Sequence, residues 1–180
     1  MKKVLVIGSS GAGKTHFSTR LSTALGVELI HIDNIYWGPG WTEPAEDEWR
    51  TRLASFLARE SWIIDGNYTG TLDMRLAACD TVIFLDIRRT LCVWRVIRRT
   101  LKFYRRRRPD MADGCFERFD WPFLLFIWNY PKKTRPKILA RIDAHRGSTR
   151  LIHLTSPGAV RRFFRDFQRD SDSVLTYVLS

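Results

Sequence analysis

The stretch Gly8-Ser-Ser-Gly-Ala-Gly-Lys-Thr15 decides the fold expected of this chain. It follows a short apolar run, residues 2–7, that is typical of a buried strand, and it opens a segment, residues 14–25, with the apolar spacing of a helix. Its spacing fits G-x-x-x-x-G-K-[ST] without a mismatch. The motif therefore predicts a phosphate-binding loop (P-loop) that holds the triphosphate of a purine nucleotide, with ATP and Mg²⁺ favoured. The alternative is a plain Gly/Ser-rich turn between a strand and a helix.

Each residue of this motif has an expected part. Glycines let the backbone curl so that successive N–H groups point at phosphate oxygens, at the positive end of the next helix. Lys14 is expected to reach the β- and γ-phosphates, and the Thr15 hydroxyl to bind Mg²⁺. The remaining nucleotide-binding residues of the loop are Gly8, Ser9, Ser10, Gly11, Ala12 and Gly13.

Strand-like and helix-like segments alternate along the rest of the chain, which predicts an α/β fold with a parallel sheet and helices on both faces. We expect one domain spanning residues 1–180. The expected strands are residues 2–7, 27–32, 62–64, 81–85 and 150–154. In such sheets ligands bind beyond the carboxyl ends of the strands.

Two aspartates follow expected strands. Asp65 ends the third strand, where an acid of a P-loop protein would hold Mg²⁺ directly or through water, and the alternative is a turn-capping role. Asp33 follows the second strand and could accept a proton from an attacking hydroxyl, or it could simply open a turn. Tyr36 and Trp37 could stack on a planar acceptor, and the alternative is ordinary packing.

Positive charge is concentrated in one segment. Residues 88–108 hold ten of the 30 basic residues and no acid, which leaves 20 basic against 19 acidic residues elsewhere. Within a helix expected from about residue 90 to 104, one face is predicted to carry Arg95, Arg98, Arg99 and Lys102. Three interpretations stay open: guanidinium groups around a migrating phosphoryl group, a solvated basic face, or contacts with nucleic-acid phosphates.

The cysteine content and the hydropathy of the chain indicate in which cellular compartment the protein is expected. Cys79, Cys92 and Cys115 match no zinc spacing and no disulfide framework, so we expect reduced thiols and a cytoplasmic protein. No apolar run approaches the roughly 20 residues that span a bilayer. We therefore expect no membrane partner.

Several sequence motifs of this chain resemble those of a known protein family. Besides the P-loop, they are DNIYWGPGW (residues 33–41), WIIDGNY (residues 62–68) and RRRRPDM (residues 105–111). Together they are similar to the adenylate-kinase-like branch of P-loop small-molecule kinases, and in particular to the FlaR-type proteins named for DNA topology modulation. The resemblance implies a P-loop NTPase fold with a five-stranded parallel sheet, an acceptor-binding segment at about residues 33–60 and a small mobile lid at about residues 105–120.

The resemblance also implies residue roles. Arg95 and Arg99 match the pair at the lid entrance that contacts phosphates, and Ser156 and Pro157 match the turn beside the adenine. Adenylate kinases follow Asp-Gly with Phe-Pro-Arg, whereas this chain has Asn67-Tyr68-Thr69 and carries no Lys or Arg in residues 33–49. This difference favours a hydroxyl acceptor. The substrate-binding candidates are Asp33, Tyr36, Trp37, Asn67 and Arg75.

These observations predict a kinase that transfers the γ-phosphoryl group of Mg·ATP to a small nucleotide, nucleoside or similar hydroxyl compound. The expected catalytic residues are Lys14, Asp33, Arg95 and Arg99. The alternative is a nucleotide-gated nucleic-acid-binding protein that affects DNA topology. The first requires an acceptor pocket lined by Asp33 and Arg75, with Arg95 facing the P-loop. The second requires residues 88–108 to lie on an exposed face turned away from the P-loop.

Overall fold

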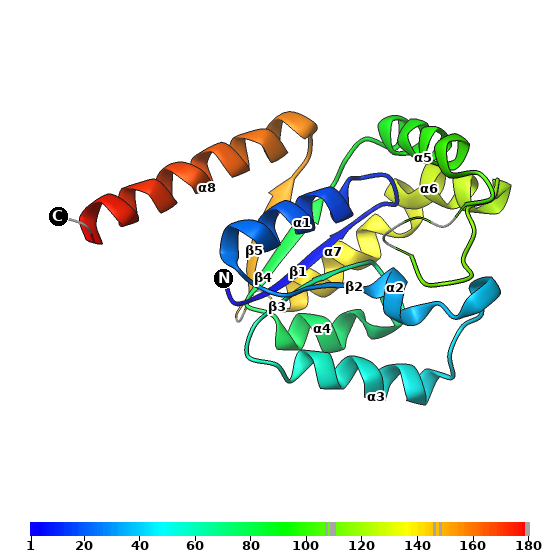
Figure 1. Cartoon of the computed structure of the whole chain (residues 1–180), viewed down its shortest axis with the longest axis horizontal. Helices are drawn as coiled ribbons and strands as arrows, with labels where there is room; N and C mark the ends of the chain where they lie inside the picture. Colours follow the sequence, from blue (N-terminus) through cyan, green and yellow to red (C-terminus); the bar gives the residue numbers. More distant parts are fainter. Residues whose placement is uncertain (107, 109–110, 146, 148, 179–180) are drawn as a thin grey trace.

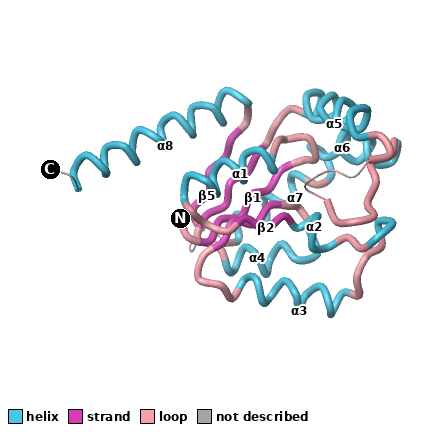
Figure 2. The backbone as a smooth tube through the Cα atoms, viewed as in Figure 1, coloured by secondary structure: helices cyan, strands magenta, loops and turns pink. Residues whose placement is uncertain are grey.

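Five parallel strands form the centre of the molecule in the computed structural model, which describes residues 1–106, 108, 111–145, 147 and 149–178 (Figures 1 and 2). The sheet has the order β2-β3-β1-β4-β5. The strands are β1 (Lys3–Gly8), β2 (Leu29–His31), β3 (Trp62–Asp65), β4 (Thr81–Leu85) and β5 (Arg150–Leu154). The α/β class and the five-stranded parallel sheet predicted from the sequence are confirmed.

Helices cover both faces of this sheet (Figure 1). They are α1 (Lys14–Leu25), α2 (Ile32–Tyr36), α3 (Glu46–Leu57), α4 (Leu72–Ala78), α5 (Arg89–Phe103), α6 (Trp121–Lys133), α7 (Arg135–Ala144) and α8 (Pro157–Val178). Short 3₁₀ turns occupy η1 (Pro39–Trp41) and η2 (Thr69–Thr71). Within the described residues, no helix is both long enough and apolar enough to cross a membrane.

Side chains alternate between two hydrophobic cores, because successive residues of a strand point to opposite faces. In β1, Leu5 and Ile7 join the core covered by α3, α4 and α7. Val4 and Val6 join the core covered by α1 and α5, to which α8 adds Phe164. Burial on both faces explains why β1 is an uninterrupted apolar run.

The helical segments carry details beyond the alternation of strands and helices. A short helix, α2, directly follows β2. The helical stretch after residue 121 is broken at Thr134, between α6 and α7. Pro136 lies in the first turn of α7, where its missing N–H needs no partner. The last helix, α8, runs from Pro157 to Val178 and extends away from the sheet (Figure 1).

Candidate active site

The P-loop joins β1 to α1 and takes a conformation that needs glycine. Gly8, Gly11 and Gly13 have φ angles of 151°, 80° and 99°. A Cβ on Gly8 would lie 2.5 Å from the carbonyl oxygen of Leu85, and a Cβ on Gly11 would collide with the carbonyl oxygen of Cys92. The loop therefore lies against β4 and α5 at distances that a side chain would prevent.

Lys14 lies across the inside of this loop. Its Nζ donates to the carbonyl oxygens of Gly8, at 3.0 Å, and Ser9, at 3.3 Å. Burial lowers the pKa of Lys14, and the nearby carboxylates of Asp33 and Asp65 oppose that shift. The ammonium group is thus held in a partly desolvated place beside two acids, where an anion would interact with it strongly.

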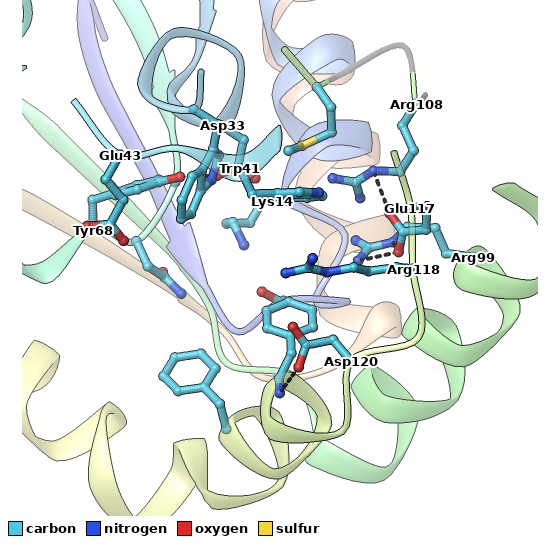
Figure 3. Close-up of a pocket in the computed structure, with 17 residues that line it drawn as sticks. Lys14, Asp33, Trp41, Glu43, Tyr68, Arg99, Arg108, Glu117, Arg118 and Asp120 are labelled. Carbon is cyan, nitrogen blue, oxygen red and sulfur yellow. Dashed lines mark hydrogen bonds and ion pairs between the residues drawn. The ribbon is translucent and has the colours of Figure 1, made fainter. Parts of the chain in front are cut away.

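A cavity of about 530 Å³ opens beside Lys14 (Figure 3). It brings together several predicted site residues that are far apart in the sequence: Ser10, Lys14, Asp33, Trp37, Asn67 and Arg99. The cavity also contains two arginines of the expected lid, Arg108 and Arg118. Other lining residues were not singled out from the sequence, among them Glu43, Tyr68, Glu117 and Phe123. The convergence follows from the fold, since the carboxyl ends of β1, β2 and β3 meet at this edge of the sheet.

Asp33 lies at the acceptor side of the cavity, on α2. The hydroxyl of Tyr68 donates to its Oδ1 at 2.9 Å. Burial, and then the charge of Asp33, raise the pKa of Tyr68 above its ordinary value, so the phenol stays a donor. One oxygen of Asp33 is therefore fixed by Tyr68, which orients the carboxylate. Asn67 lies between these groups and the P-loop, where its Oδ1 accepts from the Gly8 amide at 3.0 Å.

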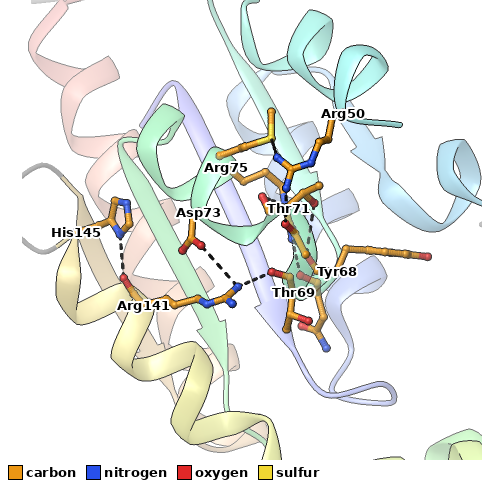
Figure 4. A network of polar contacts seen from close by, with 11 residues as sticks. Arg50, Tyr68, Thr69, Thr71, Asp73, Arg75, Arg141 and His145 are labelled. Carbon is orange, nitrogen blue, oxygen red and sulfur yellow. Dashed lines mark hydrogen bonds and ion pairs between the residues drawn. The ribbon is translucent and has the colours of Figure 1, made fainter. Parts of the chain in front are cut away.

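Arg75, predicted to contact substrate, does not line the cavity. It is fully buried beneath residues 66–68 and donates to the carbonyl oxygens of Gly66 at 2.8 Å, of Tyr68 at 2.6 Å and of Asn67 (Figure 4). These bonds hold a strained turn, because Tyr68 has a φ of 29°. Arg75 thus shapes the segment that carries Asn67 and Tyr68.

The basic residues of α5, predicted to share one face, are divided between two. Arg95 faces the P-loop, since its Nη1 donates to the carbonyl oxygens of Gly11 at 3.3 Å and Ala12 at 3.2 Å. Arg99 lines the cavity. Arg98 is exposed and its guanidinium lies 4.7 Å from the ring centroid of Trp94, and Lys102 is exposed as well. Of these four residues, only Arg95 and Arg99 point toward the P-loop and the cavity.

Glu117 connects the expected lid to α5. Its carboxylate is 7% exposed and pairs with Arg99 at 3.3 Å and Arg108 at 3.2 Å (Figure 3). It also accepts from the Thr100 hydroxyl at 2.9 Å. The sequence contained no signal for this residue, because Glu117 lies outside every motif and its partners come from α5 and the lid. The carboxylate holds two cavity arginines at a fixed place.

The described part of the expected lid is docked on the acceptor segment. Met111, Ala112 and Cys115 are buried against Trp37 and Trp41. The indole Nε1 of Trp41 donates to the carbonyl oxygen of Phe116 at 3.2 Å. Residues 107, 109 and 110 of the expected lid lie outside the described residues. The aromatic side chains after β2 thus pack against the segment that closes one side of the cavity.

Solved structures share this architecture. The chain superimposes on shikimate kinase from Acinetobacter baumannii in complex with shikimate with a TM-score of 0.55 and 19% identity, over 100% of this chain and 96% of that one. It superimposes on deoxyadenosine kinase from M. mycoides with bound dATP with a TM-score of 0.51 and 13% identity, over 94% and 98% of the two chains. The chain has a P-loop kinase fold.

Comparison of the sequence with known families and proteins gives a match to only part of the chain. No family model matches the chain. The uncharacterized protein YqaC of Bacillus subtilis (strain 168) is 29% identical over 105 residues, which are 57% of this chain and 59% of that protein. The match therefore spans about three fifths of that relative.

The residues expected to serve Mg²⁺ in this P-loop kinase fold suit that role. Asp65 Oδ1 lies 2.9 Å from His31 Nδ1, whereas its Oδ2 is buried and has no hydrogen-bond partner among the described residues. Thr15 opens α1 directly after Lys14. In the described part of the chain, no three His, Cys, Asp or Glu side chains form a metal site of their own. This arrangement fits a metal that takes its other ligands from phosphate and water.

Besides Arg75, three predicted binding residues from outside the P-loop do not line the cavity. Tyr36 packs against Tyr68, with ring centroids 4.4 Å apart, and supports Tyr68 from behind. Ser156 caps α8, since its Oγ accepts from the Ala159 amide at 3.1 Å, and Pro157 begins that helix. Neither Ser156 nor Pro157 lines the cavity, so their place beside the adenine stays a prediction.

Proposed function

We propose that this chain transfers the γ-phosphoryl group of Mg·ATP to a hydroxyl group of a small acceptor. The observation that carries the proposal is a single cavity lined by Lys14 of the P-loop, by Asp33 and by Arg99. A phosphoryl transferase needs a phosphate-binding cation, a carboxylate for the nucleophile and guanidinium groups for the transferred charge. The P-loop kinase fold supports the same conclusion.

The proposed reaction assigns a part to each of these groups. The acceptor hydroxyl oxygen attacks the γ-phosphorus, the bond from this phosphorus to the β,γ-bridging oxygen breaks, and the hydroxyl proton passes to Asp33. Tyr68 keeps Asp33 oriented through its hydrogen bond. Lys14 and Arg99 face the cavity in which the transferred charge would lie, and Arg95 braces the P-loop. Such preorganised cations stabilise the transition state more than the ground state.

Thr15 and Asp65 are the residues that would hold Mg²⁺ in this proposal. The buried, unpartnered Oδ2 of Asp65 is the observation that favours an ion or its water shell beside the P-loop. When bound, the metal would neutralise charge on the β- and γ-phosphates.

The acceptor side of the cavity suits a compound with several hydroxyl groups. Asp33 and Glu43 offer hydrogen-bond acceptors, the side-chain NH2 group of Asn67 offers a donor, and Trp37 and Trp41 offer aromatic surface. Sugars, sugar-like rings and nucleosides combine hydroxyl groups with a flat or apolar face. The proposal also places this chain among the FlaR-type kinases that its sequence resembles. In it, Ser156 and Pro157 form the turn beside the adenine of ATP. The inward direction of Arg95 and Arg99 favours this function over binding of nucleic acid.

The test is an ATP-consumption screen with nucleosides, nucleoside monophosphates, sugars and polyols as acceptors. We expect one of these classes to raise ATP consumption. Lys14→Ala should lower that rate by ~10²-fold or more, because it removes a charge aimed at the transferred group. Lys2→Ala is the matched control, since the Lys2 side chain is 73% exposed. The proposal is wrong if no acceptor raises ATP consumption and calorimetry detects no ATP binding.

A further inference from the structure

Exposed hydrophobic side chains gather at one end of the molecule. Among the described residues, eleven large hydrophobic side chains are exposed, and ten of them belong to residues 94–128. Single exposed hydrophobic residues are ordinary in folded proteins, whereas a contiguous group of this kind marks an interaction site. None of the functions assigned above uses this group.

Eight of these side chains form one surface over α5 and α6. In α5 the spacing is i, i+3 and i+7, and in α6 it is i, i+4 and i+7, so each set follows one face of its helix, and Tyr104 directly follows α5. The two helices lie side by side (Figures 1 and 2). The α5–α6 surface consists of Trp94, Ile97, Leu101, Tyr104, Phe119, Trp121, Leu125 and Trp128.

Contacts between α5 and α6 show that their exposed hydrophobic side chains form one continuous surface. At one end of the pair, the guanidinium of Arg89 on α5 lies 4.1 Å from the ring centroid of Trp128 on α6. Toward the other end, Ile97 of α5 lines the same small hollow as Phe119 and Phe123. The helices therefore run in opposite directions, and their exposed stripes flank the seam between them.

Cations predominate on this surface. Neither α5 nor α6 contains an aspartate or a glutamate, and Asp120, the acid between Phe119 and Trp121, caps the start of α6. Cations border the apolar side chains and stack on them: Arg98 lies 4.7 Å from the Trp94 ring and Arg105 lies 5.5 Å from the Tyr104 ring. A binding partner that complements this surface is therefore both apolar and anionic.

We propose that the α5–α6 surface binds the anionic headgroup layer of a phospholipid membrane. Tryptophan and tyrosine favour the boundary between headgroups and acyl chains, and leucine and isoleucine insert just below it. Arginine and lysine beside them attract anionic lipids. The protein lies on the membrane surface in this arrangement, which revises the expectation of no membrane partner drawn from the absence of a spanning segment.

Two other occupants fit the surface less well. A nucleic-acid strand would use the arginines and the aromatic rings, but Leu101, whose side chain is 74% exposed, Ile97 and Leu125 offer it neither stacking nor hydrogen bonds. A second copy of this chain would place Arg98 and Lys102 against an equally basic surface. Like charges brought together in this way oppose association.

The experiment measures sedimentation of the full chain with vesicles. One set of vesicles contains phosphatidylcholine alone, and the other contains equal parts of phosphatidylcholine and phosphatidylglycerol. We expect binding to the anionic vesicles only, weakened but not abolished by salt because the apolar insertion is not screened. Tryptophan emission should shift to shorter wavelength on binding.

Variants test the surface itself. Trp94→Ala with Leu101→Ala should weaken binding to anionic vesicles by about tenfold or more, since both side chains would insert. Arg98→Gln with Lys102→Gln should weaken it and reduce its salt dependence. Arg50→Gln with Arg52→Gln removes equal charge from α3 and should have no effect. Because Trp94 and Leu101 are 52% and 74% exposed, these variants should melt like the wild type.

Each other outcome overturns the proposal. Equal binding to neutral and anionic vesicles, or none to either, contradicts it, as does wild-type binding by the Trp94 and Leu101 variant. An oligonucleotide bound through the same residues, without vesicle binding, assigns the surface to nucleic acid. A dimer in sedimentation analysis that is lost in Leu101→Glu, without vesicle binding, assigns it to a second copy.

Discussion

At the scale of single residues, Arg75 shows how a buried charge can support a site without entering it. Its guanidinium is enclosed by the carbonyl oxygens of Gly66, Asn67 and Tyr68. Those bonds set the turn that points the Tyr68 hydroxyl at Asp33. A buried guanidinium is tolerated only where such acceptors surround it.

We predict that Arg75→Met lowers the free energy of unfolding by about 3–5 kcal/mol, because it leaves several buried carbonyl groups without donors. Urea denaturation measures this loss. Arg141→Met is the control, since the Arg141 side chain is 40% exposed although it also donates to a nearby carbonyl, that of Thr69. Wild-type stability of Arg75→Met combined with lost acceptor binding would favour the substrate contact predicted from the sequence.

At the scale of elements, α5 carries two sets of basic side chains on different sides. Arg95 and Arg99 point toward the P-loop and the cavity, whereas Arg98 and Lys102 belong to the outer side. The burial of Cys92, Val96 and Thr100 sets this division, because these residues fix the rotation of the helix against the core. Arg95 and Arg98 are therefore neighbours on one helix with different surroundings.

We predict that Arg95→Gln lowers phosphoryl transfer by ~10-fold or more and also weakens ATP binding, because the P-loop loses the donor that braces the carbonyl groups of Gly11 and Ala12. Arg98→Gln makes the same chemical change three residues along the helix and should leave turnover close to that of the wild type. Steady-state kinetics and calorimetry on both variants give the comparison. Equal losses in the two variants would contradict the division of α5.

The expected lid is a second element, and thiol reactivity can report on it. Cys115 is buried where the expected lid meets the expected acceptor segment, and its Sγ lies 3.3 Å from the carbonyl oxygen of Gly38. Cys79 and Cys92 belong instead to the two cores of the sheet. Burial raises the pKa of both Cys79 and Cys92 to about 11, so their reactive thiolate is scarcer at neutral pH than that of an ordinary cysteine.

We predict that a thiol reagent at pH 7.5 modifies one cysteine quickly, Cys115, through opening of the lid. Cys79 and Cys92 should react only as the whole domain unfolds. ATP together with the acceptor should slow the fast phase, and Cys115→Ser should remove it. Three thiols with one common rate, indifferent to ligand, would show that the lid does not open separately.

At the scale of the whole molecule, nucleotide, metal and stability are linked, since a ligand that binds only the folded state stabilises it. ATP at a hundred times its Kd should add about 2.7 kcal/mol of stability, which raises Tm by roughly 5–10 °C for a domain of this size. If Asp65 serves the metal, Mg²⁺ should add to this shift in the wild type.

We predict that Asp65→Asn keeps the Tm shift given by ATP with EDTA and loses the additional shift given by Mg²⁺. Asp73→Asn is the control, because the Asp73 side chain is 62% exposed. Thermal melts of the three proteins with ATP, with and without Mg²⁺, make the test. Equal loss of both shifts in Asp65→Asn would point to the turn-capping role.

Sequence alone determined the P-loop, the α/β class and the positions of most strands. These features are local: glycines at fixed spacing permit one loop conformation, and strands buried on both faces require apolar runs. The ranges predicted for β4 and β5 coincide with the observed Thr81–Leu85 and Arg150–Leu154. The approach of Asp33 and Asn67 to Lys14 was also predictable, because parallel strands bring their carboxyl ends to one edge.

Only the tertiary structure decided what the long polar side chains do. The sequence predicted one basic face on α5, but helical spacing places side chains around an axis and says nothing of how the helix is rotated against the core. Arg75 has a charged side chain and was therefore assigned to substrate, yet α4 packs so that it is fully buried. The role of Glu117 follows only from the folded chain, which brings its carboxylate between Arg99 and Arg108. Contacts of this kind join segments distant in the sequence, and no local pattern specifies them.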